Sequence, residues 1–99
     1  MSERALLHLA PEDNVGVALR ALAPGETIAL DGRRLAVRDA VPFAHKVALV
    51  DLPAGATVTK FGVAIGSTTA AIPAGAHVHV HNLKSDYIVN REDFFEAAS

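Results

Sequence analysis

Three of the five histidines in this chain alternate with valine over residues 77–81, in the stretch HVHVH. In an extended strand, His77, His79 and His81 would point to one face and the two valines to the other. Neighbouring imidazoles on that face would lie roughly 6.5 Å apart, which is close enough for two of them to bind one metal ion. The stretch therefore predicts a metal-binding or catalytic strand. The alternative is a polar face of solvated or hydrogen-bonded imidazoles.

A pair of histidines supplies only two metal ligands, and we assign them to His79 and His81. His77 and His81 would lie roughly 13 Å apart in a strand and could not share an ion without a bulge. A third ligand would have to come from another chain or from elsewhere in this sequence. The candidates within this sequence are His45, Asp51 and Asp86.

Two lysines and a further histidine occur where they could contact an acidic ligand. His45 and Lys46 form a cationic pair after VPFA, which could bind a carboxylate or lie at a solvated strand entrance. Lys60 stands among apolar residues in VTKFG, where its aliphatic stem could instead cover apolar surface. We interpret Asp13 and Asn14 as a helix cap and not as a ligand site.

The composition excludes several other kinds of site. Without cysteine, the chain has no thiolate nucleophile and no zinc-thiolate centre, which fits a reducing cytoplasm. The formal net charge is −2 and the basic residues are scattered, so the basic patch of a nucleic-acid-binding protein is missing. The N-terminus lacks a signal-peptide pattern, and no segment reaches the roughly 20 apolar residues of a spanning helix. We expect a soluble cytoplasmic protein that binds neither nucleic acid nor membrane.

The elements that position these residues begin with a strand and a helix. A length of 99 residues and an apolar fraction of 51% predict one small globular domain. Residues 4–9 form a short apolar run that predicts a first strand. Apolar residues then recur with helical spacing over residues 15–22, after a cap at Asp13 or Asn14. We therefore expect a single short helix near the N-terminus.

From residue 27 onward the pattern predicts a mostly β fold. Asp31-Gly32 predicts a tight hairpin turn between strands at residues 27–30 and 34–37. Further strands are expected within residues 45–52, 57–66 and 77–83. Residues 21–28, 51–58 and 71–78 share one corner pattern, an apolar residue, Pro and Ala, and then a glycine. Positive φ is expected at the corner glycines Gly25, Gly55 and Gly75.

These motifs together resemble a known family. PEDNVGVAL, GETIAL and FAHKVALVDLPAGATVTKFGVAIGSTTAAIPAGAHVHVHNLK are similar to the SAF-type domain of altronate and galactarate dehydratases, the UxaA family. The chain also resembles the small subunit of two-subunit members, including sulfolactate sulfo-lyase. The likeness runs from about Leu7 to Lys84. Phe61 replaces an expected Tyr, and Val50 replaces an Arg that would offer a carboxylate partner.

The resemblance implies a β-clip fold in one SAF-like domain, with a core over about residues 5–84 and a tail or short helix over 85–99. It implies a lyase that eliminates water, or sulfite in the sulfo-lyase branch, from an acidic sugar or hydroxy acid. The associated cofactor is a divalent metal, iron or manganese, held by this chain or by a large lyase subunit. We expect a natural small subunit in a homo- or hetero-oligomer that is inactive without the large one.

Within that resemblance, we assign roles to the residues already singled out. The catalytic candidates are His77, His79, His81 and Asn82. The substrate-binding candidates are His45, Lys46 and Lys60. Two alternatives stay open, namely a non-catalytic SAF ligand-binding module and an assembly element that uses Phe94-Phe95 as its contact.

Overall fold

The computed structural model describes residues 5–30 and 32–85, and every regular element within them is a β-strand. The mostly β fold is therefore confirmed. The strands are β1 (Leu6–Leu7), β2 (Val15–Ala18), β3 (Thr27–Leu30), β4 (Arg33–Ala36), β5 (Lys46–Ala48), β6 (Thr57–Lys60), β7 (Val63–Thr68), β8 (His77–Val78) and β9 (Leu83–Lys84). Residues 86–99, with the expected C-terminal tail and Phe94-Phe95, lie outside the described residues.

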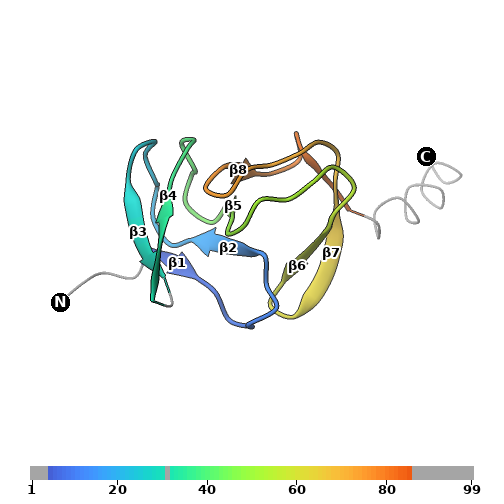
Figure 1. The fold of residues 1–99 in the computed structure, drawn as a ribbon, viewed down its shortest axis with the longest axis horizontal. Helices are drawn as coiled ribbons and strands as arrows, with labels where there is room; N and C mark the ends of the chain where they lie inside the picture. The colour runs from blue at the N-terminus through green and yellow to red at the C-terminus, as the bar shows by residue number, and fades with distance from the viewer. Residues whose placement is uncertain (1–4, 31, 86–99) are drawn as a thin grey trace, which may run out of the picture.

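The strands form three antiparallel sheets. A central sheet has the order β1-β2-β5-β8, the hairpin β3–β4 forms a second sheet, and β6-β7-β9 forms a third. In Figure 1 the hairpin lies at one end of the central sheet, and β6 and β7 lie at the other. The predicted hairpin at residues 27–30 is confirmed, but its second strand begins one residue earlier than expected, because Leu30 pairs with Arg33.

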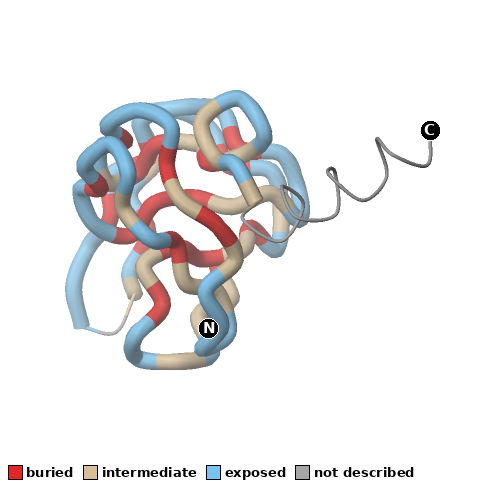
Figure 2. The backbone as a smooth tube through the Cα atoms, turned by 90° about the vertical axis from the view of Figure 1, so that its right-hand side faces the viewer, coloured by how far each residue is buried: buried red, intermediate tan, exposed pale blue. Residues whose placement is uncertain are grey.

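The central sheet is buried on both faces, since it separates two apolar clusters. Successive residues of β5 belong to different clusters. Val47 packs in the cluster with Leu22 and Leu35, beneath the hairpin. Ala48 packs in the cluster with Val58, beneath β6. Val47 and Ala48 are fully buried. Figure 2 shows these buried segments running through the middle of the molecule, with exposed corners around them. Polar side chains at the ends of the central strands are consequently held by a rigid base.

The expected helix over residues 15–22 is wrong. Residues 15–18 are β2, which pairs with β1 on one side and β5 on the other. Two β-branched valines flank Gly16, and all three residues have poor helix propensity. A Cβ on Gly16 would lie 3.3 Å from Leu49 Cδ2, so only glycine fits easily at this place in the sheet. Burial of Val15 and Ala18 on the sheet outweighs the local helical spacing.

Asp13 consequently caps no helix and binds the turn between β6 and β7. Its carboxylate accepts hydrogen bonds from the N–H groups of Phe61 (2.7 Å), Gly62 (2.8 Å) and Ala10 (3.3 Å). Phe61 and Gly62 both have positive φ, a conformation these bonds help to hold. Burial alone would raise the pKa of the Asp13 carboxyl, but the backbone donors outweigh it and the pKa is lowered. Asn14 likewise bonds to the backbone of β6.

The three corners repeat as predicted. Gly25, Gly55 and Gly75 have φ values of 92°, 80° and 88°, so the expected positive φ is confirmed at each. Space around the first two is open, whereas a Cβ on Gly75 would meet the carbonyl oxygen of Ala36 at 1.9 Å. The third corner therefore packs directly on the end of β4.

Candidate functional site: a histidine cluster

Four imidazoles gather where β5 begins and β8 ends. Because β5 and β8 pair with Val47 opposite His77, the histidine just before β5 lies beside the end of β8. The ring centroids of His45 and His79 are 4.0 Å apart, and those of His45 and His77 are 5.1 Å apart, with near-parallel planes. The His81 ring lies 5.2 Å from that of His77. We call His45, His77, His79 and His81 the histidine cluster.

The cluster forms through a turn and not through the extended strand we expected. β8 ends at Val78, and residues 79–82 turn back toward β9. Asn82 closes this turn, since its Oδ1 accepts from His79 N (3.0 Å) and its Nδ2 donates to His77 O (2.8 Å). Such side-chain bonds to the local backbone compete with a strand ladder. The turn brings His81 close to His77, which a straight strand would not do.

A short hydrogen bond joins two of the rings. His45 Nδ1 and His77 Nε2 are 2.8 Å apart, so one nitrogen carries the proton and the other accepts it. His79 Nδ1 is buried, and no described residue gives it a hydrogen-bond partner. An orphaned buried nitrogen of this kind is uncommon and fits a ligand atom.

Three of the histidines could hold one metal ion. Ligand nitrogens of His45, His77 and His79 all lie within 4.8 Å of one another, and the three side chains are half-buried. The geometry therefore favours this trio over the pair His79 and His81 that we assigned from the sequence, and His81 is exposed. Of the candidate third ligands, His45 lies in the cluster, whereas Asp51 bonds to Ala74 N (2.8 Å). The remaining candidate, Asp86, lies outside the described residues.

The electrostatics keep two of these rings neutral near pH 7. Burial lowers the pKa of His77, and the neighbouring His45, His81 and His79 lower it further, while Asp39 acts in the opposite direction. Burial, followed by His45, Lys46 and His81, lowers the pKa of His79. A neutral imidazole offers a lone pair, which can bind a metal or accept a proton.

Lys46 adds positive charge beside the cluster, since it is one of the groups that lower the pKa of His79. Lys46 is half-buried, and its pKa is lowered by burial and then by the charge of Lys60. The Lys60 ammonium lies 5.1 Å from the centroid of the Phe61 ring, within cation–π range. The two lysines predicted to bind substrate therefore lie near one another. His45, the third such candidate, instead lies among the histidines. This charge suits an acidic ligand.

One contributing residue was not found from the sequence. Asp39 Oδ2 accepts a hydrogen bond from His77 N (2.9 Å) and so supports the first residue of β8, just before the turn. These residues are 38 positions apart, and nothing in the local sequence around Asp39 indicates the contact. The hydrogen bond between His45 and His77 was equally invisible, because it depends on the pairing of β5 with β8.

The sequence matches a recognised family of SAF domains. The family model described as altronate/galactarate dehydratase SAF domain matches residues 4–86, so the chain belongs to that family. It is 45% identical to the altronate dehydratase of Escherichia coli over 74 residues, which are 75% of this chain and 15% of that protein.

Shorter relatives match as well. The chain is 49% identical over 49 residues to the (2R)-sulfolactate sulfo-lyase subunit alpha of Chromohalobacter salexigens, covering 50% of this chain and 52% of that subunit. It is 44% identical over 52 residues to the subunit of the same name from Paracoccus pantotrophus, covering 52% of this chain and 78% of that subunit. Against the E. coli dehydratase, in contrast, this chain spans less than a sixth of the length. None of the described residues form a helix that is long and apolar enough to cross a membrane.

Proposed function

We propose that this chain is the small subunit of an altronate-dehydratase-like lyase, which eliminates water from a sugar acid together with a separate large subunit. The observation that carries the proposal is the histidine cluster, with neutral imidazoles in an electropositive setting. The family contains lyases and dehydratases, which supports the reaction class. We further propose that the complex acts in the cytoplasm, which the absence of cysteine fits.

Elimination of a group β to a carboxylate has three chemical requirements. A base must remove the proton α to the carboxylate, the developing enediolate must be stabilised, and an acid must protonate the leaving hydroxyl. His77 and His79 have lowered pKa values and so can accept a proton near pH 7. The exposed His81 is placed to donate one to a ligand that approaches from solvent.

Other residues of the site bind or orient. Lys46 and Lys60 supply the positive charge that attracts a carboxylate substrate, and His45 holds His77 through their shared hydrogen bond. Asn82 acts as a positioning residue, because both ends of its amide are bonded to the backbone of the histidine turn. It therefore has a different role from the direct catalytic one that we assigned from the sequence.

The cofactor we propose is ferrous or manganous ion. The residues fit such an ion, since His45, His77 and His79 converge and His79 Nδ1 has no partner among the described residues. When bound, the ion would supply positive charge that stabilises the negative charge developing on oxygen. These three histidines would hold it, with the remaining ligands from substrate, water or the large subunit. A ring that binds the ion cannot also accept the substrate proton, so in the metal-bound site the base would be another group of the complex, and His77 and His79 would act as bases only without the ion.

A second candidate function is the small subunit of a sulfolactate sulfo-lyase, in which sulfite is the leaving group. It is supported by the matches to two sulfolactate sulfo-lyase alpha subunits, of which the matched region covers 52% and 78%. The same cluster could serve either reaction, because both require a proton to be removed α to a carboxylate.

The first test is calorimetric titration of the chain with Mn²⁺ at neutral pH. We expect saturable binding that falls by about 100-fold in His77→Ala and His79→Ala, because each loses one nitrogen ligand. His8→Gln is the control, since His8 lies near Asp13 and outside the cluster. Equal binding by all variants would exclude the histidine cluster as the metal site.

The second test reconstitutes the chain with a large subunit and offers altronate and (2R)-sulfolactate separately. Dehydration of altronate would support the first function, and release of sulfite the second. Full activity of His79→Ala in the active complex would overturn the role of the cluster in either reaction.

A further inference from the structure

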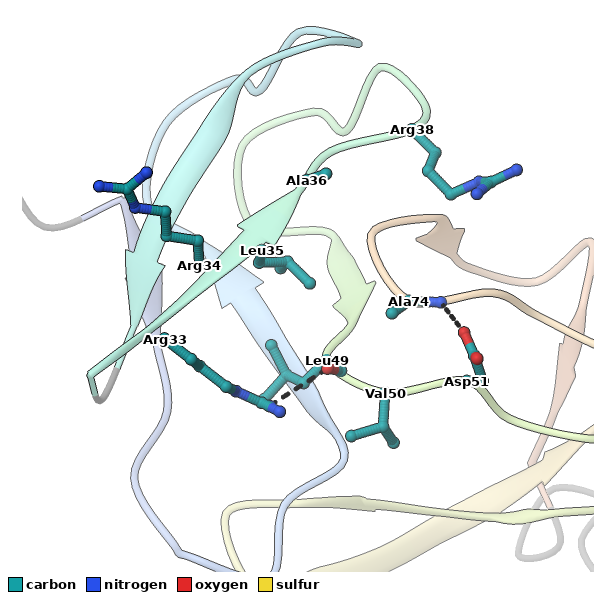
Figure 3. A pocket seen from close by; sticks show the side chains of 9 residues that line it. All are labelled: Arg33, Arg34, Leu35, Ala36, Arg38, Leu49, Val50, Asp51 and Ala74. Carbon is teal, nitrogen blue, oxygen red and sulfur yellow. Dashed lines mark hydrogen bonds between the residues drawn. The ribbon is translucent and has the colours of Figure 1, made fainter.

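A cavity lies outside the histidine cluster, beside the hairpin β3–β4, and three arginines are among the residues that line it. It has a volume of about 410 Å³, within the range of roughly 300–1,000 Å³ typical of small-molecule sites. Its lining comes from β4, from the chain after β5 and from the third corner (Figure 3). The lining residues are Arg33, Arg34, Leu35, Ala36, Arg38, Leu49, Val50, Asp51 and Ala74. We call this cavity the arginine pocket.

Two arginines flank the pocket from different sides. Figure 3 shows Arg33 reaching toward Leu49 and Val50, and Arg38 on the opposite side, above Ala74. Arg34 extends to the other side of β4, so its charge is not directed between them. Leu49 and Val50 give apolar surface beside Arg33, whereas the guanidinium of Arg38 is directed outward, away from Arg33.

The walls of the pocket are fixed by short-range contacts. Arg33 Nη2 donates to Leu49 O (3.2 Å), which holds its guanidinium against the chain after β5. Arg38 N donates to Gly75 O (2.9 Å), and the missing side chain of Gly75 allows the corner to meet Ala36. The backbone around the pocket is therefore fixed, while the side chains of Arg33 and Arg38 are exposed to solvent and accessible to a ligand.

The positive charge of the pocket is not neutralised by the described part of the protein. No described carboxylate forms an ion pair with Arg33 or Arg38, and the hydrogen bond of Arg33 is to a neutral carbonyl. Asp51 lines the pocket, but one of its oxygens accepts from Ala74 N (2.8 Å). The planar fork of an arginine matches the oxygens of a carboxylate or phosphate. The second oxygen of Asp51 can accept a hydrogen bond from a hydroxyl group.

We propose that the arginine pocket binds a small hydroxylated organic anion, with one oxyanion group at Arg33, a second on the side of Arg38 and a hydroxyl on Asp51. Carboxylate and phosphate share the oxyanion chemistry. The hydrocarbon part of such a ligand would lie on Leu49 and Val50. The site is separate from the histidine cluster, since the two share no residue, and this proposal does not rest on the proposed lyase function.

The test is an NMR titration of the isotope-labelled full chain at constant ionic strength. The probes are succinate, tartrate and inorganic phosphate, with chloride as the reference anion. We expect saturable shifts of the amides of Arg38, Val50 and Ala74 with at least one oxyanion. Tartrate should bind more tightly than succinate, because it has the same two carboxylates and adds hydroxyls. Phosphate compared with succinate distinguishes the two oxyanions.

Two arginine variants and one control locate the site. Arg33→Gln and Arg38→Gln should each weaken binding by about tenfold or more, since each removes a charged hydrogen-bond donor. Lys84→Gln removes the same charge from an exposed position on β9 and should leave the affinity unchanged. Arg38→Lys keeps the charge but loses the fork, and should fall between Arg38→Gln and the wild type.

Three results would overturn the proposal. The first is amide shifts that rise linearly with every oxyanion and match those caused by chloride. The second is shifts confined to the histidine turn. The third is equal affinities for Arg38→Gln, Arg33→Gln and the unaltered chain. Native spectra of the variants will show that the fold is intact. Binding that is lost in His79→Ala but kept in Arg38→Gln would instead assign the anion to the histidine cluster.

Discussion

The histidine cluster and the arginine pocket lie on either side of one corner, and they offer opposite chemistry. The corner at residues 73–76 gives Ala74 to the pocket and leads directly into His77. Arginine keeps its charge at every physiological pH, whereas the lowered pKa values of His77 and His79 favour neutral rings. The comparison shows how a small β domain can separate recognition of charge from proton transfer or metal binding.

The two regions are nevertheless joined by consecutive residues. Arg38 lines the pocket and donates its N–H to Gly75, while the carboxylate of Asp39 accepts from the N–H of His77. The segment after β4 therefore touches both sides of the corner. Changes at this junction can show whether the two regions are independent.

The largest effect is expected from Gly75→Ala, which should damage both regions together. The new Cβ would lie 1.9 Å from Ala36 O, and φ at this position is +88°. We expect a loss of about 3 kcal/mol or more in unfolding free energy, measured by chemical denaturation. Gly55→Ala is the matched control, because its Cβ would meet nothing within 4 Å. Its positive φ alone should cost about 1 kcal/mol. Equal losses would show that the contact with β4 is unimportant.

Asn82→Ala should damage the histidine cluster and spare the arginine pocket. It removes the hydrogen bonds that fix His77 O and His79 N in the turn. We expect the Mn²⁺ affinity to fall by about tenfold, because residues that orient metal-binding side chains typically have effects of this size. The NMR shifts caused by anions at the arginine pocket should be unchanged. If the metal affinity is unchanged while the turn resonances move, the orientation of the turn does not matter for binding.

Acidification should separate the two regions without any mutation. The pKa values of His77 and His79 lie below the usual 6.5, so both rings stay neutral above that pH and take up protons as the pH falls below it. As the pH falls, the unfolded chain takes up these protons before the folded chain does. The contribution of the two neutral rings to the free energy of unfolding is therefore complete above pH 6.5 and is lost on acidification. Histidine NMR titrations will give the pKa values directly. Tartrate binding at the arginines should change little between pH 8 and 6, because the arginines and both tartrate carboxylates keep their charges over this range.

The smallest effect is expected for Asp39→Asn. The negative charge of Asp39 raises the pKa of His77, so its removal should lower that pKa further, by a small amount because Asp39 is exposed. The amide can keep the hydrogen bond to His77 N. A rise in the pKa of His77 would contradict this account.

Local patterns predicted the corners and the hairpin well, since Gly25, Gly55 and Gly75 each need positive φ whatever surrounds them. The helix at 15–22 failed because burial of β2 between two strands outweighs local spacing. The alternation of histidines predicted the stretch that carries the candidate site. It could not predict the turn, which depends on Asn82, or the ring contacts, which depend on His45. The arginine pocket had no sequence signal, because it joins three distant segments.

The hydrogen bond between His45 and His77 has a consequence for how a cation would enter. A neutral imidazole exists as two tautomers, which differ only in the nitrogen that bears hydrogen. If the donor ring changes tautomer, both facing nitrogens expose lone pairs, and the pair releases no proton to solvent. Two imidazole nitrogens at right angles on one ion lie about 2.9 Å apart, given metal–nitrogen bonds of about 2.0–2.1 Å. The observed 2.8 Å is already close to that spacing. A cation shared by the two rings would therefore leave the spacing of the two nitrogens almost unchanged, and each ring would turn so that its lone pair is directed at the ion.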